Sequence, residues 1–151
     1  MRVAVGSDHR GFQIMSSLVQ HLRADGHEVE MLADCGGSSC DYPDVAYQVA
    51  RAVADGQAER GILMCGTGIG MCIAANKVKG VLAALAQDEL SAQLSRTHNN
   101  ANVLCLSADL TGTTLAKRIV DTFMKTNFEG GRHDRRIRKI HEIEEGHAPS
   151  K

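Results

Sequence analysis

Residues 61–77 read GILMCGTGIGMCIAANK, and this segment gives the clearest indication of the fold class. Its first part, Gly61–Met64, is apolar at consecutive positions, which is typical of a parallel strand that is covered on both faces. Glycines at positions 66, 68 and 70 then mark a tight loop, and the residues that follow fit a helix. A strand that runs through a glycine loop into a helix is the kind of unit from which α/β proteins are built.

The same alternation of short apolar runs and helical periods extends on both sides of this stretch. Four further strand-length runs are Val3–Val5, Val29–Leu32, Val81–Ala86 and Val103–Leu106. Helices are predicted from Phe12 to near Gly26, from Pro43 to near Gly56, after the capping residue Asp88, and through Leu115, Ile119 and Phe123. Five strand–helix units with right-handed crossovers predict an α/β fold: a single domain, residues 1–151, with an α/β/α sandwich around a parallel sheet.

The C-terminal segment, about residues 130–151, has a different character. Arg132–Lys139 carries five fixed positive charges against one negative charge. The isoleucines at 137, 140 and 143 give this predicted helix a narrow apolar stripe, which suits docking on another surface better than filling a core. Arg132 and Arg136 lie one turn apart, so both can reach one phosphate, although the same charges also fit a solvated tail.

Composition excludes several classes of protein. Lys and Arg total 17 and Asp and Glu total 18, so no global positive field favours nucleic acid or an anionic membrane. No run approaches the roughly 20 apolar residues of a membrane span, and Met1–Gly6 meets polar residues too early for a signal peptide, so we expect a cytoplasmic protein. The five cysteines form no CxxC pair, which predicts free thiols rather than a disulfide framework. No metal-ligand spacing is present, and we expect no metal.

Two predicted strand ends carry groups that can do chemistry, and ligands of parallel sheets bind at such ends. Asp8 and His9 follow the first strand, where they can also simply cap the next helix. The loop Gly66–Gly70 can converge backbone N–H groups on a phosphate or an oxyanion, and the same field favours the thiolate of Cys65. The alternative for this loop is a tight turn beside a small buried cysteine.

A third polar cluster precedes the fifth predicted strand. His98 stands among asparagines at 99, 100 and 102. Imidazole titrates near neutrality, which makes His98 a candidate acid–base group, whereas turn geometry alone can explain the asparagines.

Taken together, these motifs resemble the ribose-5-phosphate isomerase B / galactose-6-phosphate isomerase family. The resemblance runs in order over about residues 1–140. Its motifs are GSDHRG at 6–11, DYPD at 41–44, CGTGIGM at 65–71, AANK at 74–77, HNNAN at 98–102 and EGGR at 129–132. The resemblance implies a Rossmann-like sandwich that acts without a cofactor on a phosphosugar in pentose phosphate metabolism. It also implies a homodimer or a dimer-of-dimers tetramer, with sites at the subunit interface and the C-terminal helix docked on the partner.

The resemblance further implies a role for each matching residue. Cys65 is the base for an enediolate intermediate, and His98, helped by Thr67, opens the sugar ring. The residues implied in substrate binding are Asp8, His9, Tyr42, Gly66, Gly68, Ile69, Gly70, Asn99, Asn102, Arg132 and Arg136, of which His9 and the two arginines meet the phosphate.

Two departures from the family pattern leave the sugar open. Asp109 stands where many members carry an arginine that resembles a phosphate ligand, and Gln87 stands where histidine is common. Ribose 5-phosphate is the expected substrate. A tetrose 4-phosphate, allose or galactose 6-phosphate and an unphosphorylated sugar are alternatives with the same chemistry. A non-catalytic phosphate- or nucleotide-binding module is the alternative from another class.

Overall fold

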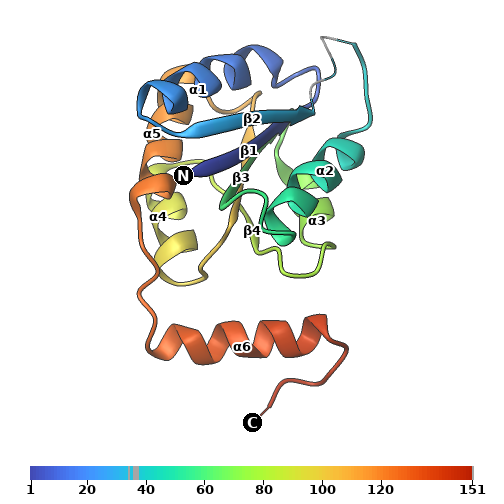
Figure 1. Ribbon diagram of the computed structural model, residues 1–151, viewed down its shortest axis with the longest axis vertical. Helices are drawn as coiled ribbons and strands as arrows, with labels where there is room; N and C mark the ends of the chain where they lie inside the picture. Colours follow the sequence, from blue (N-terminus) through green and yellow to red (C-terminus); the bar gives the residue numbers. More distant parts are fainter. Residues whose placement is uncertain (34, 36–37, 151) are drawn as a thin grey trace.

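Five parallel strands in the order β2-β1-β3-β5-β4 form the centre of the molecule, as the apolar runs predict (Figure 1). The computed structural model describes residues 1–33, 35 and 38–150. The strands are β1 (Arg2–Ser7), β2 (Glu28–Ala33), β3 (Arg60–Cys65), β4 (Ala83–Leu85) and β5 (Val103–Ser107). The helices are α1 (Phe12–Ala24), α2 (Tyr42–Ala54), α3 (Ile69–Ala75), α4 (Glu89–Thr97), α5 (Thr113–Lys125) and α6 (Arg132–Glu144).

Helices cover both faces of the sheet, so the predicted three-layer sandwich is confirmed. One apolar core lies between the sheet and α1, α4 and α5, and it includes Met15, Ile62 and Phe123. The second core lies between the sheet and α2 and α3, and it includes Val49 and Leu63. Successive residues of β3 lie alternately in the first and the second core, so both faces of this strand are apolar.

Local signals account for the helix boundaries. Asp88 caps α4 as predicted: its carboxylate accepts from the Ser91 N–H at 2.6 Å, within a capping box. Pro43 lies in the first turn of α2, and Gly26, with φ 83°, follows the end of α1.

Two expectations need correction. The predicted strand Val81–Ala86 is shorter than expected, because only Ala83–Leu85 pairs with β5. Asn102 holds the chain just before that strand, since its side chain accepts from Leu82 N–H and donates to the Gly80 carbonyl. Cys35 and Cys40 form a disulfide, whereas free thiols were expected; their Cα atoms lie 6.0 Å apart, a separation that a disulfide spans.

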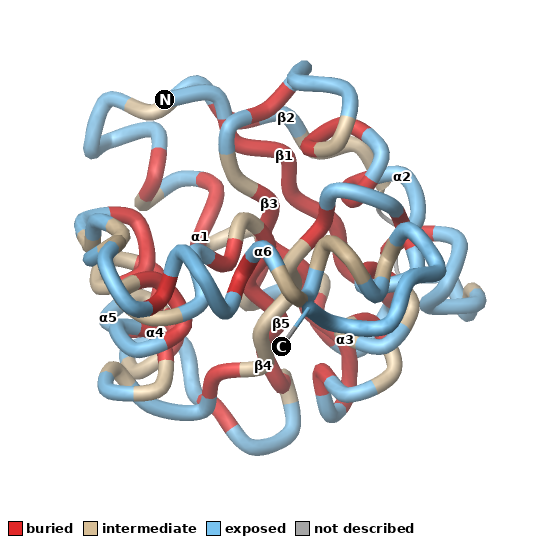
Figure 2. Tube along the Cα trace, turned by 90° about the horizontal axis from the view of Figure 1, so that it is seen from below, coloured by how far each residue is buried: buried red, intermediate tan, exposed pale blue. Residues whose placement is uncertain are grey.

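The predicted C-terminal helix is present as α6, which crosses one end of the molecule and is mostly exposed (Figures 1 and 2). Of its apolar stripe, Ile137 is buried, but Ile140 and Ile143 remain 39% and 57% exposed. These two side chains line a groove of about 390 Å³ together with Val81 and Leu82. Among the described residues, no helix has both the length and the apolar character to cross a membrane.

Candidate active site

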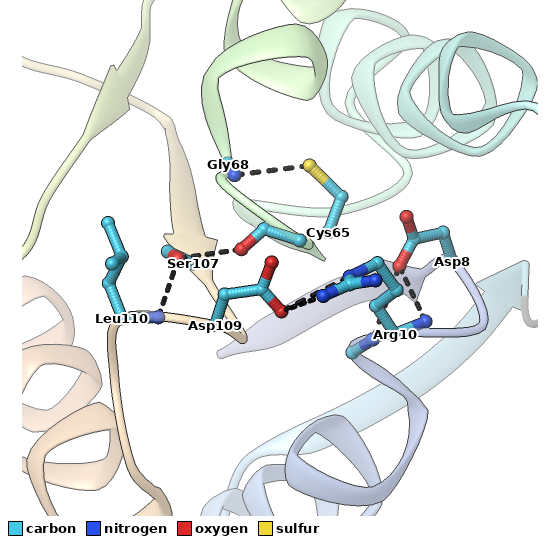
Figure 3. Close-up of polar contacts among 9 residues, drawn as sticks. Asp8, Arg10, Cys65, Gly68, Ser107, Asp109 and Leu110 are labelled. Atoms are coloured by element: carbon cyan, nitrogen blue, oxygen red, sulfur yellow. Dashed lines mark hydrogen bonds and ion pairs between the residues drawn. The ribbon is translucent and has the colours of Figure 1, made fainter.

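Cys65 lies at the carboxyl end of the central strand β3, and it is buried. The Gly68 N–H donates to Cys65 Sγ at 3.1 Å (Figure 3). Gly68 has φ 75°, a left-handed conformation that favours glycine, and a Cβ there would lie 2.9 Å from the carbonyl group of Leu106. The turn that aims this N–H at the sulfur therefore depends on glycine. Because α3 has only seven residues, the loop amides rather than a long helix dipole supply the positive field.

The chain beside Cys65 is braced by the end of β5. Ser107 pairs in register with Cys65, and its hydroxyl donates to the Gly66 carbonyl at 2.7 Å while accepting from Leu110 N–H at 3.0 Å (Figure 3). Asp109 N–H donates to the same Gly66 carbonyl. Sequence reasoning missed Ser107, because its only signal is the strand pairing that places it beside Cys65.

The turn after β1 lies at the same carboxyl edge. Asp8 is buried, and its Oδ1 accepts from the N–H groups of Arg10 and Gly11 at 2.9 and 3.2 Å. One oxygen of this carboxylate thus holds the turn that precedes α1, but it accepts from no N–H group within the helix, which begins after Gly11. His9 is exposed in the same turn.

The glycine loop also contacts the start of α2. A Cβ on Gly70 would lie 2.5 Å from the Tyr42 ring, so glycine at this position lets the ring pack against the loop. Thr67 and Ile69 are exposed on the loop, where the Thr67 hydroxyl accepts from Ile69 N–H at 3.3 Å. We call Asp8, His9, Tyr42 and the loop 65–70 the Cys65 group.

An ion pair that the sequence did not predict stands over this loop. Arg10 Nη2 lies 2.7 Å from Asp109 Oδ1, and a Cβ on Gly66 would lie 2.9 Å from Arg10 Nε (Figure 3). Asp109, which reverses the charge of the family pattern, thus faces a guanidinium supplied by the β1–α1 turn. This pairing offsets the reversed charge beside the loop.

The remaining predicted site residues lie elsewhere. His98 follows α4 and precedes β5, which places it at the amino end of the strands. The Glu129 N–H donates to the Thr97 carbonyl and brings the start of α6, with Arg132 and Arg136, to the same end. A six-residue strand such as β3 spans about 16 Å at a rise of about 3.3 Å per residue. One chain therefore holds Cys65 and His98 at opposite edges of its sheet.

The His98 ring stacks on the ring of His133, with centroids 4.3 Å apart and planes 11° from parallel. His133 is buried, whereas His98 is partly exposed and Arg132 and Arg136 are exposed. We call His98, Asn99, Arg132, His133 and Arg136 the His98 group.

The chain around His98 is held by a buried arginine. Arg96 donates to the carbonyls of Ala101 and Thr126 and to Asn100 Oδ1, and burial lowers its pKa to about 10. Asn99 is exposed in this loop. Asn102, by contrast, uses both ends of its amide on the chain before β4, so in this structure it supports the fold.

One set of side chains in this region has the composition of a metal site. Ligand atoms of His98, Glu129 and His133 lie within 4.8 Å of one another, and sequence spacing did not reveal the set because His98 comes from another helix. Two near-parallel rings direct their nitrogen lone pairs along parallel planes rather than to one point. Arg132 Nε, 3.4 Å from His133 Nε2, adds a fixed positive charge. The arrangement therefore suits an imidazole stack better than a cation.

Cys72 and Cys105 form a thiol pair on the Cys65 side of the sheet. A hydrogen bond from the Cys105 thiol lowers the pKa of half-buried Cys72 to about 7, and the same interaction, with burial, raises the pKa of Cys105. Cys72 Sγ also lies 3.5 Å from the Ala83 carbonyl oxygen. Through these contacts Cys72 packs α3 against β4 and β5.

Comparison with known proteins decides the family. The ribose/galactose isomerase family matches residues 3–140. The chain belongs to this family. It is 45% identical over 144 residues to ribose-5-phosphate isomerase B of Escherichia coli, covering 95% of this chain and 97% of that protein. It is 43% identical over 141 residues to D-erythrulose-4-phosphate isomerase of Pectobacterium atrosepticum, covering 93% of each.

Solved structures agree with this membership. The type B ribose 5-phosphate isomerase of Trypanosoma cruzi superposes with a TM-score of 0.93 at 45% identity, over 97% of this chain and 100% of that one. The predicted resemblance is thus confirmed, and the chain is an aldose–ketose isomerase.

Proposed function

We propose that the chain interconverts ribose 5-phosphate and ribulose 5-phosphate through an enediolate, with Cys65 as the base. The observation that carries the proposal is the Gly68 N–H aimed at Cys65 Sγ, inside a loop of backbone donors at the carboxyl edge of the sheet. The Gly68 N–H fixes the position of the sulfur, and the neighbouring amides can hold an anionic oxygen. Relatives named for ribose 5-phosphate support this choice of sugar.

The proposed reaction begins with the opening of the sugar ring. His98, helped by Thr67, opens the ring: the C1–O4 bond breaks, O1 loses its proton, and O4 receives one. The Cys65 thiolate then removes the proton from C2, and the electron pair forms the enediolate, which amides of the loop 66–70 stabilise. Cys65 returns a proton to C1 while the hydroxyl proton moves from O2 to O1, which completes the ketose.

We infer that a complete site takes the Cys65 group from one copy and the His98 group from a second copy. Within one chain the two groups lie at opposite ends of β3, so they cannot meet on one sugar phosphate. The exposed Ile140 and Ile143 offer α6 an apolar surface for the partner. His9, Arg132 and Arg136 would then surround the phosphate from two sides.

Mixing two inactive variants tests this sharing. In a symmetric dimer, Cys65→Ala and His98→Asn chains form mixed dimers in which one site carries both changes and the other carries neither. Random mixing should restore about a quarter of the parent activity. Mixtures as inactive as their components would show that each site belongs to one chain, and sizing in solution gives the oligomeric state.

The first measurement of the reaction is proton NMR of ribose 5-phosphate with the protein in deuterium oxide. Ribulose 5-phosphate with deuterium at C1 is the expected product, and Cys65→Ala should abolish it. Absence of exchange, with a folded protein, would reject this substrate.

A tetrose 4-phosphate is the second candidate substrate. The 43% identical relative named for D-erythrulose 4-phosphate motivates it, and so does the Arg10–Asp109 pair, which changes the charge pattern beside Gly66. A panel of tetrose, pentose and hexose phosphates and an unphosphorylated pentose, ranked by kcat/KM, decides between them. Ribose 5-phosphate should rank first.

A further inference from the structure

His133 is a buried imidazole to which the reaction steps above give no task. It is 3% exposed, although it lies in the first turn of a helix that is otherwise largely open to water (Figure 2). Its ring covers one face of His98 at a centroid distance of 4.3 Å. A polar ring is rarely buried against another one without a structural or chemical reason.

The backbone is arranged to make this contact. The Glu129 N–H donates to the Thr97 carbonyl, which ties the approach to α6 to the residue before His98. Gly130 and Gly131 then turn the chain with φ values of 70° and 60°, conformations that favour glycine. The Glu129–Arg132 motif therefore brings one imidazole over the other.

The second neighbour of His133 is Arg132. Its Nε–H donates to His133 Nε2 at 3.4 Å, so this nitrogen is the unprotonated one in the contact. Glu129 Oε2 is 3.8 Å from the same nitrogen. Burial, His98 and Arg132 lower the pKa of His133, which favours the neutral form of its ring. His133 thus contacts both the imidazole assigned to ring opening and an arginine assigned to the phosphate.

We propose that His133 is a positioning residue for ring opening, which fixes the plane of the His98 ring and its alignment with Arg132. The inference rests on the proposed function. Imidazole donates and accepts in its own plane, so the tilt of His98 decides whether its nitrogen reaches the ring oxygen or O1. A stacked neighbour fixes that tilt, and a small misplacement of a catalytic group can cost about 10²-fold in rate.

The test separates ring opening from proton transfer. Ribulose 5-phosphate is acyclic, because its O5 carries the phosphate and cannot close a five-membered ring onto C2. Deuterium exchange at its C1 needs the base and the enediolate but no ring opening. In His133→Asn we expect kcat from ribose 5-phosphate to fall about 10²-fold, while C1 exchange stays within about threefold of the parent.

A second variant separates the stack from the polar contact. His133→Phe keeps a flat ring beside His98 but gives Arg132 no acceptor. It should restore kcat from ribose 5-phosphate to within about fivefold of the parent, while KM rises above the parent value because Arg132 has lost its acceptor. His141→Asn is the matched control: the same substitution on the same helix, at a partly exposed ring near Glu144, should change neither rate.

Three results would overturn the inference. Equal losses of both rates in His133→Asn, or in His133→Phe if the asparagine variant does not fold, would mean general damage to the site. A kcat in His133→Asn equal to that of the parent would mean that the stack has no role in ring opening. A parent protein that shows neither isomerisation nor C1 exchange would reject the proposed function itself, and the role of His133 with it.

Discussion

The Cys65 group and the His98 group are carried by two different kinds of support. Cys65 ends a central strand whose neighbours on both sides are strands, and hydrogen bonds from Gly68 and Ser107 fix its surroundings. His98 ends a helix, and Arg132 and Arg136 begin another that is mostly exposed. Proton abstraction at carbon tolerates little error in position, whereas phosphate binding by long arginines tolerates more. In the proposed mechanism, the sheet holds the base Cys65, and the C-terminal helix carries the two arginines assigned to the phosphate.

The change with the largest expected effect is Cys65→Ala. Loss of a general base should lower kcat/KM by about 10²–10⁴-fold, with thermal stability close to that of the parent because the side chain is small. Coupled kinetics and thermal unfolding measure the two quantities. Cys72→Ala is the matched control, and equal activity losses in both variants would contradict the assignment of the base.

Substitution of both Arg132 and Arg136 by alanine should raise KM for the sugar phosphate. Two charge-assisted contacts to a phosphate are worth about 10–100-fold in KM, and stability should hold because both side chains are exposed. Steady-state kinetics at fixed ionic strength measure it. Arg135→Ala with Arg138→Ala removes the same charge from the same helix, and an equal rise in KM there would indicate long-range charge alone.

Gly68→Ala tests the rigidity of the Cys65 group. Left-handed strain and a collision with the Leu106 carbonyl should cost about 2 kcal/mol or more in the free energy of unfolding. Gly26→Ala, at φ 83° with open space around it, should cost only about 1 kcal/mol. Urea unfolding measures both variants. Equal losses in the free energy of unfolding would show that the loop can move to accommodate a side chain at position 68.

The Arg10–Asp109 pair should have the smallest effect on stability. Its side chains are 54% and 39% exposed, so a double-mutant cycle should give a coupling of about 0.2–1 kcal/mol. The pair matters more for the substrate. Asp109→Ala should change the order in which sugar phosphates rank by kcat/KM, with little change in the free energy of unfolding. An unaltered order would show that the pair has no role in substrate specificity.

The sequence predicts the parts that depend on local signals. Consecutive apolar residues marked β3, the capping residue Asp88 marked α4, and alternate glycines marked the loop after Cys65. Local signals could not predict contacts between distant segments: the Arg10–Asp109 pair, the brace from Ser107 and the stack of His133 on His98 each join residues at least 35 positions apart. The position of His98 at the opposite edge from Cys65 follows from strand direction and pairing, which local patterns leave open.

The two edges of the sheet bear on how copies of the chain can associate. β4 exposes only three residues of strand, and the pairing of β2 with β1 shifts register near Gly6. Short or irregular edges give an incoming strand few N–H and C=O groups to pair with, which discourages open-ended polymers. Any contact between copies would then depend on side chains, and the two-fold sharing proposed above would close such a contact at a pair.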